Sequence, residues 1–282
     1  MNSKEFNEYC PEFYIDTIKR EKKYNMESHF HEALEIFYLI DGERRYFIND
    51  TIYKVSSGNL VLVDINEIHK TADTDVFAHK RLVLNFNPSF IYEICPKSSG
   101  LDLCSCFKSN RKILPLSLKY KKDMEHIFHR MMEIYDSESE TKRFHLQILL
   151  CELLLLINNH LNELKTKDKN LVYSINPKIS KIIKYINSYY YEDITLSSAG
   201  KKLHISPFYL SKLFKENTSL TFVEYLNSVR IRKAKELLID TDYRVIDITE
   251  KVGFNNHTHF TRTFKALTGV SPLQYRKLMI RE

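Results

Sequence analysis

A chain of 282 residues is long enough for two domains, each with its own hydrophobic core. Its formal charge of +6 is concentrated in residues 178–282, which carry 18 basic and 10 acidic side chains, whereas the rest carries 24 and 26, so the C-terminal part suits a polyanionic partner. The charged N-terminus argues against a signal peptide, and the longest apolar run (148–157) is broken by Glu152, which argues against a membrane span. The odd count of five cysteines argues against a disulfide scaffold. Together these features predict a cytoplasmic protein.

Residues 1–115 are predicted to be rich in β-strands. Short runs of branched and aromatic residues recur, and turn signals at 41–42, 49–50 and 57–59 separate them. Strands at this spacing predict a small sandwich or barrel. The expected strands cover residues 34–40, 45–48, 51–55, 60–63 and 82–86.

One group of polar residues falls inside this region. His29, His31 and Glu35 occupy odd positions of one extended stretch, so the two-residue period of a strand places them on one face with Phe37. His69 follows later in the chain. Three imidazoles and a carboxylate can hold a first-row metal, line a pocket for an organic effector, or serve a purely structural role. We predict an effector pocket without a metal or other cofactor, lined by His29, His31, Glu35, Phe37 and His69.

The hydrophobic period becomes helical from about Lys119. One amphipathic helix is expected over 124–135, and a second over 144–164 is apolar nearly all round. The second helix must be covered by the barrel or by another subunit. Residues 166–170 are polar and charged, which is typical of a linker between domains. Cys104 and Cys106 lie only two positions apart, which is not a usual zinc spacing, so ordinary thiols are favoured over metal ligands or a redox pair.

The same helix-turn-helix pattern occurs twice in the C-terminal part, over 196–216 and 245–267. Each copy begins with a short helix, turns at 204–206 or 253–255, and restarts at a capping residue, Ser206 or Asn256. A helix over 222–239, about 27 Å long, joins the copies. That length can place the two second helices roughly one duplex turn, ~34 Å, apart in successive major grooves.

The outward faces of the two second helices carry hydroxyl, imidazole and cationic groups, which suit base edges and phosphates. In one copy such a face could equally be an ordinary solvated surface, but two copies of matched polarity favour DNA binding. The predicted DNA-contacting residues are Phe208, Ser211, Lys212, Lys215, His257, Thr258, Thr261, Arg262 and Lys265.

These residues carry a family resemblance. The segment SPFYLSKLFKENTSLTFVEYLNSVRIRKAKELL, followed by VGFNNHTHFTRTFKALTGVSPLQYR, resembles the DNA-binding domain of AraC/XylS-type transcription regulators over residues 178–278. Gly200 and Thr249 stand where the family usually has Ala, which predicts looser packing of the first helices. Ser219 replaces a usual Gly after the first recognition helix.

The spacing HxHxxxE, then Gly42, Gly58 and His69, is similar to the cupin fold over residues 25–90. The resemblance implies an α+β protein with a cupin-like β-barrel sensor domain (1–115), flanking helices in a dimerisation and linker region (116–170), and an all-α DNA-binding domain (176–282). Because the family commonly dimerises through the helical region, we favour a subunit interface there over a plain internal core helix.

The resulting prediction is a sequence-specific transcription regulator, an activator rather than an enzyme. Its expected partners are double-stranded promoter DNA, a small-molecule effector such as a sugar, a second copy of the chain, and RNA polymerase, with no membrane. One alternative is a metal-dependent cupin enzyme with a DNA-binding tail, but no arrangement of nucleophile, base and acid is evident. Another is a constitutive DNA-binding protein whose inert barrel only dimerises.

Overall fold

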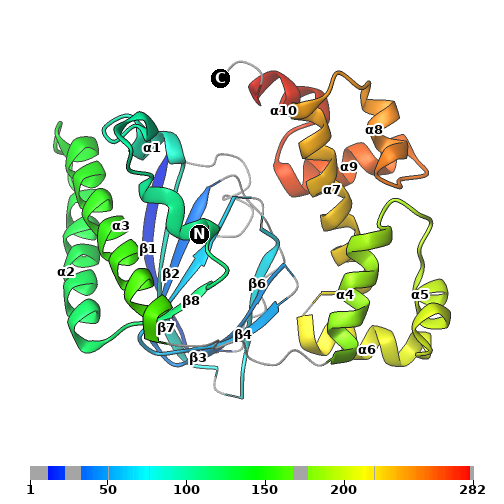
Figure 1. Cartoon of the computed structure of the whole chain (residues 1–282), viewed down its shortest axis with the longest axis horizontal. Helices are drawn as coiled ribbons and strands as arrows, with labels where there is room; N and C mark the ends of the chain where they lie inside the picture. The colour runs from blue at the N-terminus through cyan, green and yellow to red at the C-terminus, as the bar shows by residue number, and fades with distance from the viewer. Residues whose placement is uncertain are drawn as a thin grey trace.

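The computed structural model describes residues 12–22, 33–49, 51–65, 67–75, 77–167, 177–218 and 220–279. A β-barrel domain lies between a pair of long helices, α2 and α3, and a wholly helical C-terminal domain (Figure 1). This arrangement confirms the predicted α+β fold class. His29, His31 and Ser219, as well as most of the expected linker, lie outside the described residues.

Two antiparallel sheets make the barrel. One has the strand order β1-β7-β2-β5-β8, and the other has the order β4-β3-β6. The strands are β1 (Phe13–Arg20), β2 (Leu34–Asp41), β3 (Glu43–Ile48), β4 (Thr51–Ser56), β5 (Asn59–Val63), β6 (His69–Asp73), β7 (His79–Phe86) and β8 (Ile113–Pro115).

The two faces of the large sheet bury different clusters because side chains alternate along a strand. Phe37 and Leu39 of β2 point between the sheets, where they pack with Tyr46 and Val55 of the small sheet. The opposite face, which includes Ile36 and Tyr38, packs on the flanking helices. Those helices are α1 (Pro88–Tyr92), η1 (Lys97–Ser99), η2 (Leu103–Lys108), α2 (Leu118–Tyr135) and α3 (Lys142–Lys167).

Helix α3 is long and apolar enough to cross a membrane by length and composition, over Lys142–Leu164. Half of its most apolar window is nevertheless buried inside the protein. Leu149, Leu153 and Ile157 belong to the same core cluster as the outer face of the large sheet. This burial is typical of a core helix.

The C-terminal domain is a bundle of seven helices in the described part of the chain. They are α4 (Pro177–Tyr189), α5 (Leu196–Leu203), α6 (Pro207–Thr218), α7 (Phe222–Asp240), α8 (Val245–Lys251), α9 (His257–Thr268) and α10 (Pro272–Met279). The pairs α5/α6 and α8/α9 are the two helix-turn-helix units, and they lie at opposite ends of α7 (Figure 1). With 19 residues, α7 is about 28 Å long.

The core of the helical domain extends into the barrel. Phe47 of β3 and Ile68, just before β6, are buried in the same cluster as Ile182 and Tyr225. The Phe47 ring meets the Tyr225 ring edge-on, with centroids 5.9 Å apart. Arg45 of β3 also donates from Nη1 to the Glu216 carbonyl of α6, at 3.4 Å. The outer face of the small sheet is therefore the surface on which the helical domain packs.

Candidate nucleic-acid interface and barrel interior

The first helix-turn-helix unit is held by local caps. Thr195 begins α5 with a capping box, its hydroxyl accepting from the Ser198 amide at 3.1 Å. The turn passes through His204 in the left-handed region (φ 55), and the Ser206 hydroxyl then accepts from the Tyr209 amide at 3.3 Å. These caps fix where each helix starts.

Helix α6 presents the expected face. Leu210 and Phe214 are fully buried and anchor it in the domain core. Phe208 is 81% exposed. Lys212 and Lys215 are also exposed, and Ser211 is half-buried.

The close packing at Gly200 corrects one expectation. A Cβ on Gly200 would lie 2.6 Å from the Ile205 carbonyl oxygen, far inside contact distance. The turn backbone therefore occupies the space that an alanine methyl group would need. The prediction that Gly200 loosens this unit was wrong, because the glycine instead permits a closer approach of helix and turn.

The second unit has a comparable frame. Its turn passes through Gly253 (φ 88), and the Asn256 side chain caps α9 by accepting from the His259 amide at 2.8 Å. Phe260 and Phe264 are buried. Of the predicted contacts on α9, the exposed ones are His257, Thr258, Arg262 and Lys265. Thr261 is only half-buried, but its hydroxyl oxygen is buried without a hydrogen-bond partner.

Thr249, the second departure from the family pattern, joins the two helices of this unit. It is buried, and its hydroxyl donates to the Val245 carbonyl at 2.8 Å. The same oxygen lies 3.1 Å from His257 Nδ1. Because the hydroxyl donates to Val245, its oxygen can accept from Nδ1–H of His257, and in the tautomer that makes this contact Nε2 is the acceptor. Looser packing was the wrong expectation here too.

The two units share a rigid junction at Tyr190–Glu192. Arg230 of α7 donates to the carbonyls of Tyr190 (2.7 Å) and Glu192 (2.8 Å). Gly253 approaches from the other side, where a Cβ would lie 2.7 Å from the Tyr190 oxygen. The pKa of Arg230 is lowered by burial, and the charge of Asp193 opposes this shift only in part. The turn of the second unit is thus packed on the segment that leads into the first.

The barrel interior brings together three of the predicted effector residues. The carboxylate of Glu35 accepts from the Tyr46 hydroxyl at 2.5 Å and lies 3.7 Å from His69 Nε2. Phe37 is fully buried and meets Tyr46 edge-on at 5.1 Å. Burial and the charge of Glu35 raise the pKa of Tyr46 well above its usual value, so the phenol keeps its proton and donates it.

The pKa of the His69 imidazole is shifted in opposite directions by different neighbours. Burial lowers its pKa, whereas the charge of Glu35, 3.7 Å away, and the hydrogen bond to the Glu67 carbonyl raise it, and the net pKa lies above the usual value. The described residues contain no cluster of three or more potential metal ligands. The arrangement places a phenol, a carboxylate and an imidazole together on the buried inner side of the barrel.

Sequence reasoning missed the arginines of the interior. Arg44 is 1% exposed and forms an ion pair with the buried Asp73. Arg81 is 8% exposed and lies over the Phe37 ring, 5.6 Å from its centroid. The alternation of side chains along a strand could have located them. Arg44 lies on the same strand face as the buried Tyr46, and Arg81 lies on the same face as the buried Val83.

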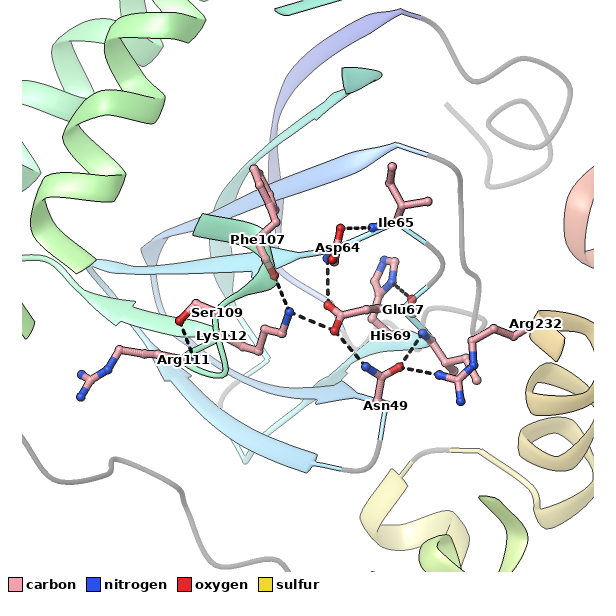
Figure 2. Close-up of polar contacts among 11 residues, drawn as sticks. Asn49, Asp64, Ile65, Glu67, His69, Phe107, Ser109, Arg111, Lys112 and Arg232 are labelled. Carbon is pink, nitrogen blue, oxygen red and sulfur yellow. Dashed lines mark hydrogen bonds and ion pairs between the residues drawn. The ribbon is translucent and has the colours of Figure 1, made fainter. Parts of the chain in front are cut away.

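A hydrogen-bonded chain leads from this interior to α7 (Figure 2). His69 Nδ1 lies 2.8 Å from the carbonyl oxygen of Glu67, whose carboxylate accepts from Asn49 Nδ2 at 2.9 Å. Asn49 Oδ1 in turn accepts from Arg232 Nη1 of α7 at 3.2 Å. Asn49 adopts φ 53, a left-handed conformation that Asn tolerates better than most residues.

The Glu67 carboxylate is held from further directions (Figure 2). Lys112 Nζ lies 2.9 Å from it and also donates to the Phe107 carbonyl at 2.8 Å. The backbone amide of Asp64 donates to its second oxygen at 2.8 Å. These contacts hold the Glu67 carboxylate in place between the barrel and the helical domain.

The thiols near η2 do not form a reactive site. Cys104 and Cys106 are both buried. Burial raises the pKa of Cys104 to about 11 and that of Cys106 further. Such thiols remain protonated and are poor nucleophiles and metal ligands.

Two helix-turn-helix units in one helical domain define the class of the protein, a helix-turn-helix DNA-binding regulator. A helix-turn-helix domain model matches residues 200–278, and the model of the AraC-like ligand-binding domain matches residues 14–154. The chain therefore belongs to the AraC family of transcription regulators.

Comparison with known proteins found the following similarities. The uncharacterized HTH-type transcriptional regulator YtdP of Bacillus subtilis is 40% identical over 96 residues, which are 34% of this chain and only 12% of that relative. The melibiose operon regulatory protein of Escherichia coli is 24% identical over 261 residues, 89% of this chain and 83% of the relative. The structure of ToxT from Vibrio cholerae matches 95% of this chain and 98% of its own, with 16% identity and a TM-score of 0.39.

Proposed function

We propose that this regulator is an activator that binds promoter DNA as a homodimer and is controlled by a small molecule bound inside its barrel. The observation that carries the proposal is the hydrogen-bonded chain from His69 through Glu67 and Asn49 to Arg232. It links the barrel interior to α7, the helix that joins the two helix-turn-helix units. A ligand that moves His69 would therefore act on the helix that sets their spacing.

DNA binding is assigned to α6 and α9. In this proposal Lys212, Lys215 and Lys265 contact phosphates, whereas His257 and Arg262 reach base edges. The exposed positions of these side chains support the assignment. RNA polymerase is the partner through which an activator of this class would act, and the cytoplasm is where it would meet its promoter.

Dimerisation is assigned to α3. Phe144, Ile148 and Leu155 are 56%, 46% and 42% exposed, at positions that fall on one helical face. Exposed apolar side chains of this size in one stripe favour an interface between subunits. The alternative is that α3 is only a core helix. The opposite face of α3 packs on α2 and η2, so core packing accounts for that face and leaves the exposed stripe unexplained.

The experiment removes the link at α7. Arg232→Met deletes the donor to Asn49, and we expect it to abolish the ligand-dependent change in operator affinity, typically ~1–3 kcal/mol of coupling. Operator affinity without ligand should stay within about twofold. The ligand is the compound, from a panel of sugars and sugar acids, that raises the midpoint of thermal unfolding of the full chain.

Lys233→Met is the matched control, since Lys233 is the next residue on α7 and forms an ion pair with Glu236 of the same helix, at 2.7 Å. It should leave the response intact. Full ligand response in Arg232→Met would contradict this route of control. Failure of every ligand to alter operator binding by the parent protein would favour the constitutive alternative.

A further inference from the structure

The barrel interior contains a buried cation that is paired with no charged or hydrogen-bonding group among the described residues. Arg81 is 8% exposed, and its guanidinium forms neither a hydrogen bond nor an ion pair with any described residue. Its contact is the Phe37 ring, 5.6 Å away. Burying an unpaired charge costs free energy, which a cation–π contact only partly offsets.

The surroundings add positive charge. Arg44 from the facing sheet is paired with Asp73, and burial, followed by the charges of Arg81 and Arg20, lowers its pKa. Burial also lowers the pKa of His79, and both Arg44 and Arg81 contribute to that shift. Asp73 opposes these effects but is already engaged by Arg44. An additional negative charge would therefore be stabilised here.

A second unsatisfied group lies further along the same strand. Asn85 is 2% exposed, and its Oδ1 has no hydrogen-bond partner in the described part of the chain. Arg81, Val83 and Asn85 share one face of β7 and stand opposite Leu39, Phe37 and Glu35 of β2.

The spacing of these groups suits a small molecule. Four residues of strand separate the two polar positions by ~13 Å between Cα atoms, and side chains that lean together shorten that gap. Val83 lies between them on β7 and packs with Phe37 in the hydrophobic cluster between the two sheets. Buried polar groups kept without partners are costly, and ligand recognition is one reason to retain them.

We propose that the barrel is a receptor for a hydroxylated organic acid, a class that includes the sugar acids. Its carboxylate would take two parallel hydrogen bonds from the Arg81 guanidinium, and a hydroxyl would donate to Asn85 Oδ1. One uncommitted guanidinium matches a monoanionic carboxylate better than a dianionic phosphate ester. This inference rests on the proposed effector site and specifies the charge of the ligand.

The first test needs no ligand. Arg81→Met replaces the unpaired cation by an apolar side chain, and we expect the ligand-free full chain to unfold at a temperature higher by about 2–4 °C. Lys80→Met, at an exposed position of β7 whose side chain lies on the other face of the strand, should leave the midpoint unchanged. A lower midpoint for Arg81→Met would mean that the arginine is structural, and would overturn the proposal.

The second test uses matched probes. Calorimetric titration of the full chain compares galacturonate, gluconate and glucarate with galactose, sorbitol and glucose 6-phosphate. At least one acid should bind ten times more tightly than any neutral compound or the phosphate, and Arg81→Gln should remove that preference while Lys80→Gln keeps it. Binding of acids that is unchanged in Arg81→Gln, or no binding of any acid, overturns the inference.

The outcomes also separate this inference from the effector site itself. A neutral sugar that binds the parent and Arg81→Gln equally, but not Phe37→Ala, would keep the barrel as the effector site and overturn only its preference for acids. A preference for glucose 6-phosphate lost in Arg81→Gln would place a phosphate, not a carboxylate, on Arg81.

Discussion

The two helix-turn-helix units have similar helices, turns and caps, but the side chains that they expose differ in chemistry. The first exposes a bare aromatic ring, Phe208, and lysines that act as mobile point charges. The second exposes Arg262, whose planar fork can read guanine, and His257, whose ring is oriented by Thr249. We propose from this difference that the second unit selects the DNA sequence, whereas the first contacts the DNA backbone.

The largest effect should come from the turn of the second unit. Gly253→Ala adds a methyl group 2.7 Å from the Tyr190 oxygen at a residue whose φ is +88. Strain of ~1–3 kcal/mol plus this overlap should lower the free energy of unfolding by more than ~3 kcal/mol and displace α9. Urea unfolding and operator binding measure both losses.

Gly58→Ala isolates the backbone strain. Gly58 also has positive φ (+82), but nothing lies within 4 Å of its added Cβ. We expect a loss of ~1–2 kcal/mol and normal DNA binding. Equal losses in Gly58→Ala and Gly253→Ala would show that the packing against Tyr190 is unimportant.

Arg262→Ala tests sequence selection directly. We expect a loss of ~1–3 kcal/mol on the operator and a much smaller loss on unrelated DNA. Competitive gel-shift titrations give the two values. If both DNAs lose the same affinity, Arg262 contacts phosphate and the proposed division of work fails.

Thr249→Val sharpens the role of His257. The substitution keeps the shape of the buried side chain but removes the oxygen that orients the ring. With Nε2 no longer held as an acceptor for a base amino group, operator affinity should fall by ~0.5–1.5 kcal/mol. His257→Ala combined with Thr249→Val should cost no more than His257→Ala by itself, and additive losses would contradict this linkage.

The smallest effect is expected at Lys215 of the first unit. Lys215→Ala should weaken binding to operator and unrelated DNA alike and reduce the slope of log affinity against log salt by about 1. Titrations at several salt concentrations provide the slope. A loss confined to the operator would give the first unit a share in sequence selection.

The sequence predicted local features well where a few adjacent residues determine them. The caps at Ser206 and Asn256 follow from residue type and from their position just before each second helix. The approach of His69 to Glu35 was less evident, because it depends on how the two sheets close.

Long-range packing was beyond the reach of periodicity. Arg44 and Arg81 were not identified although each shares a strand face with buried residues, since charged side chains on alternating strands usually face water. The contact of Asn49 with Arg232 joins positions 183 residues apart, and no local pattern marks it. Gly200 and Thr249 were misjudged because comparison with a family pattern does not show which atoms occupy the neighbouring space.

The core shared between Phe47, Ile68 and Tyr225 bears on the engineering of hybrid regulators. Grafting this barrel onto the helical domain of a relative would leave the Phe47 ring against whatever residue replaces Tyr225. A graft that exchanges only the chain after position 176 therefore replaces one side of this interdomain contact and keeps the other. Hybrids that transplant Phe47 and Ile68 together with the helical domain keep that contact whole, and with it the seat of α7 on the barrel.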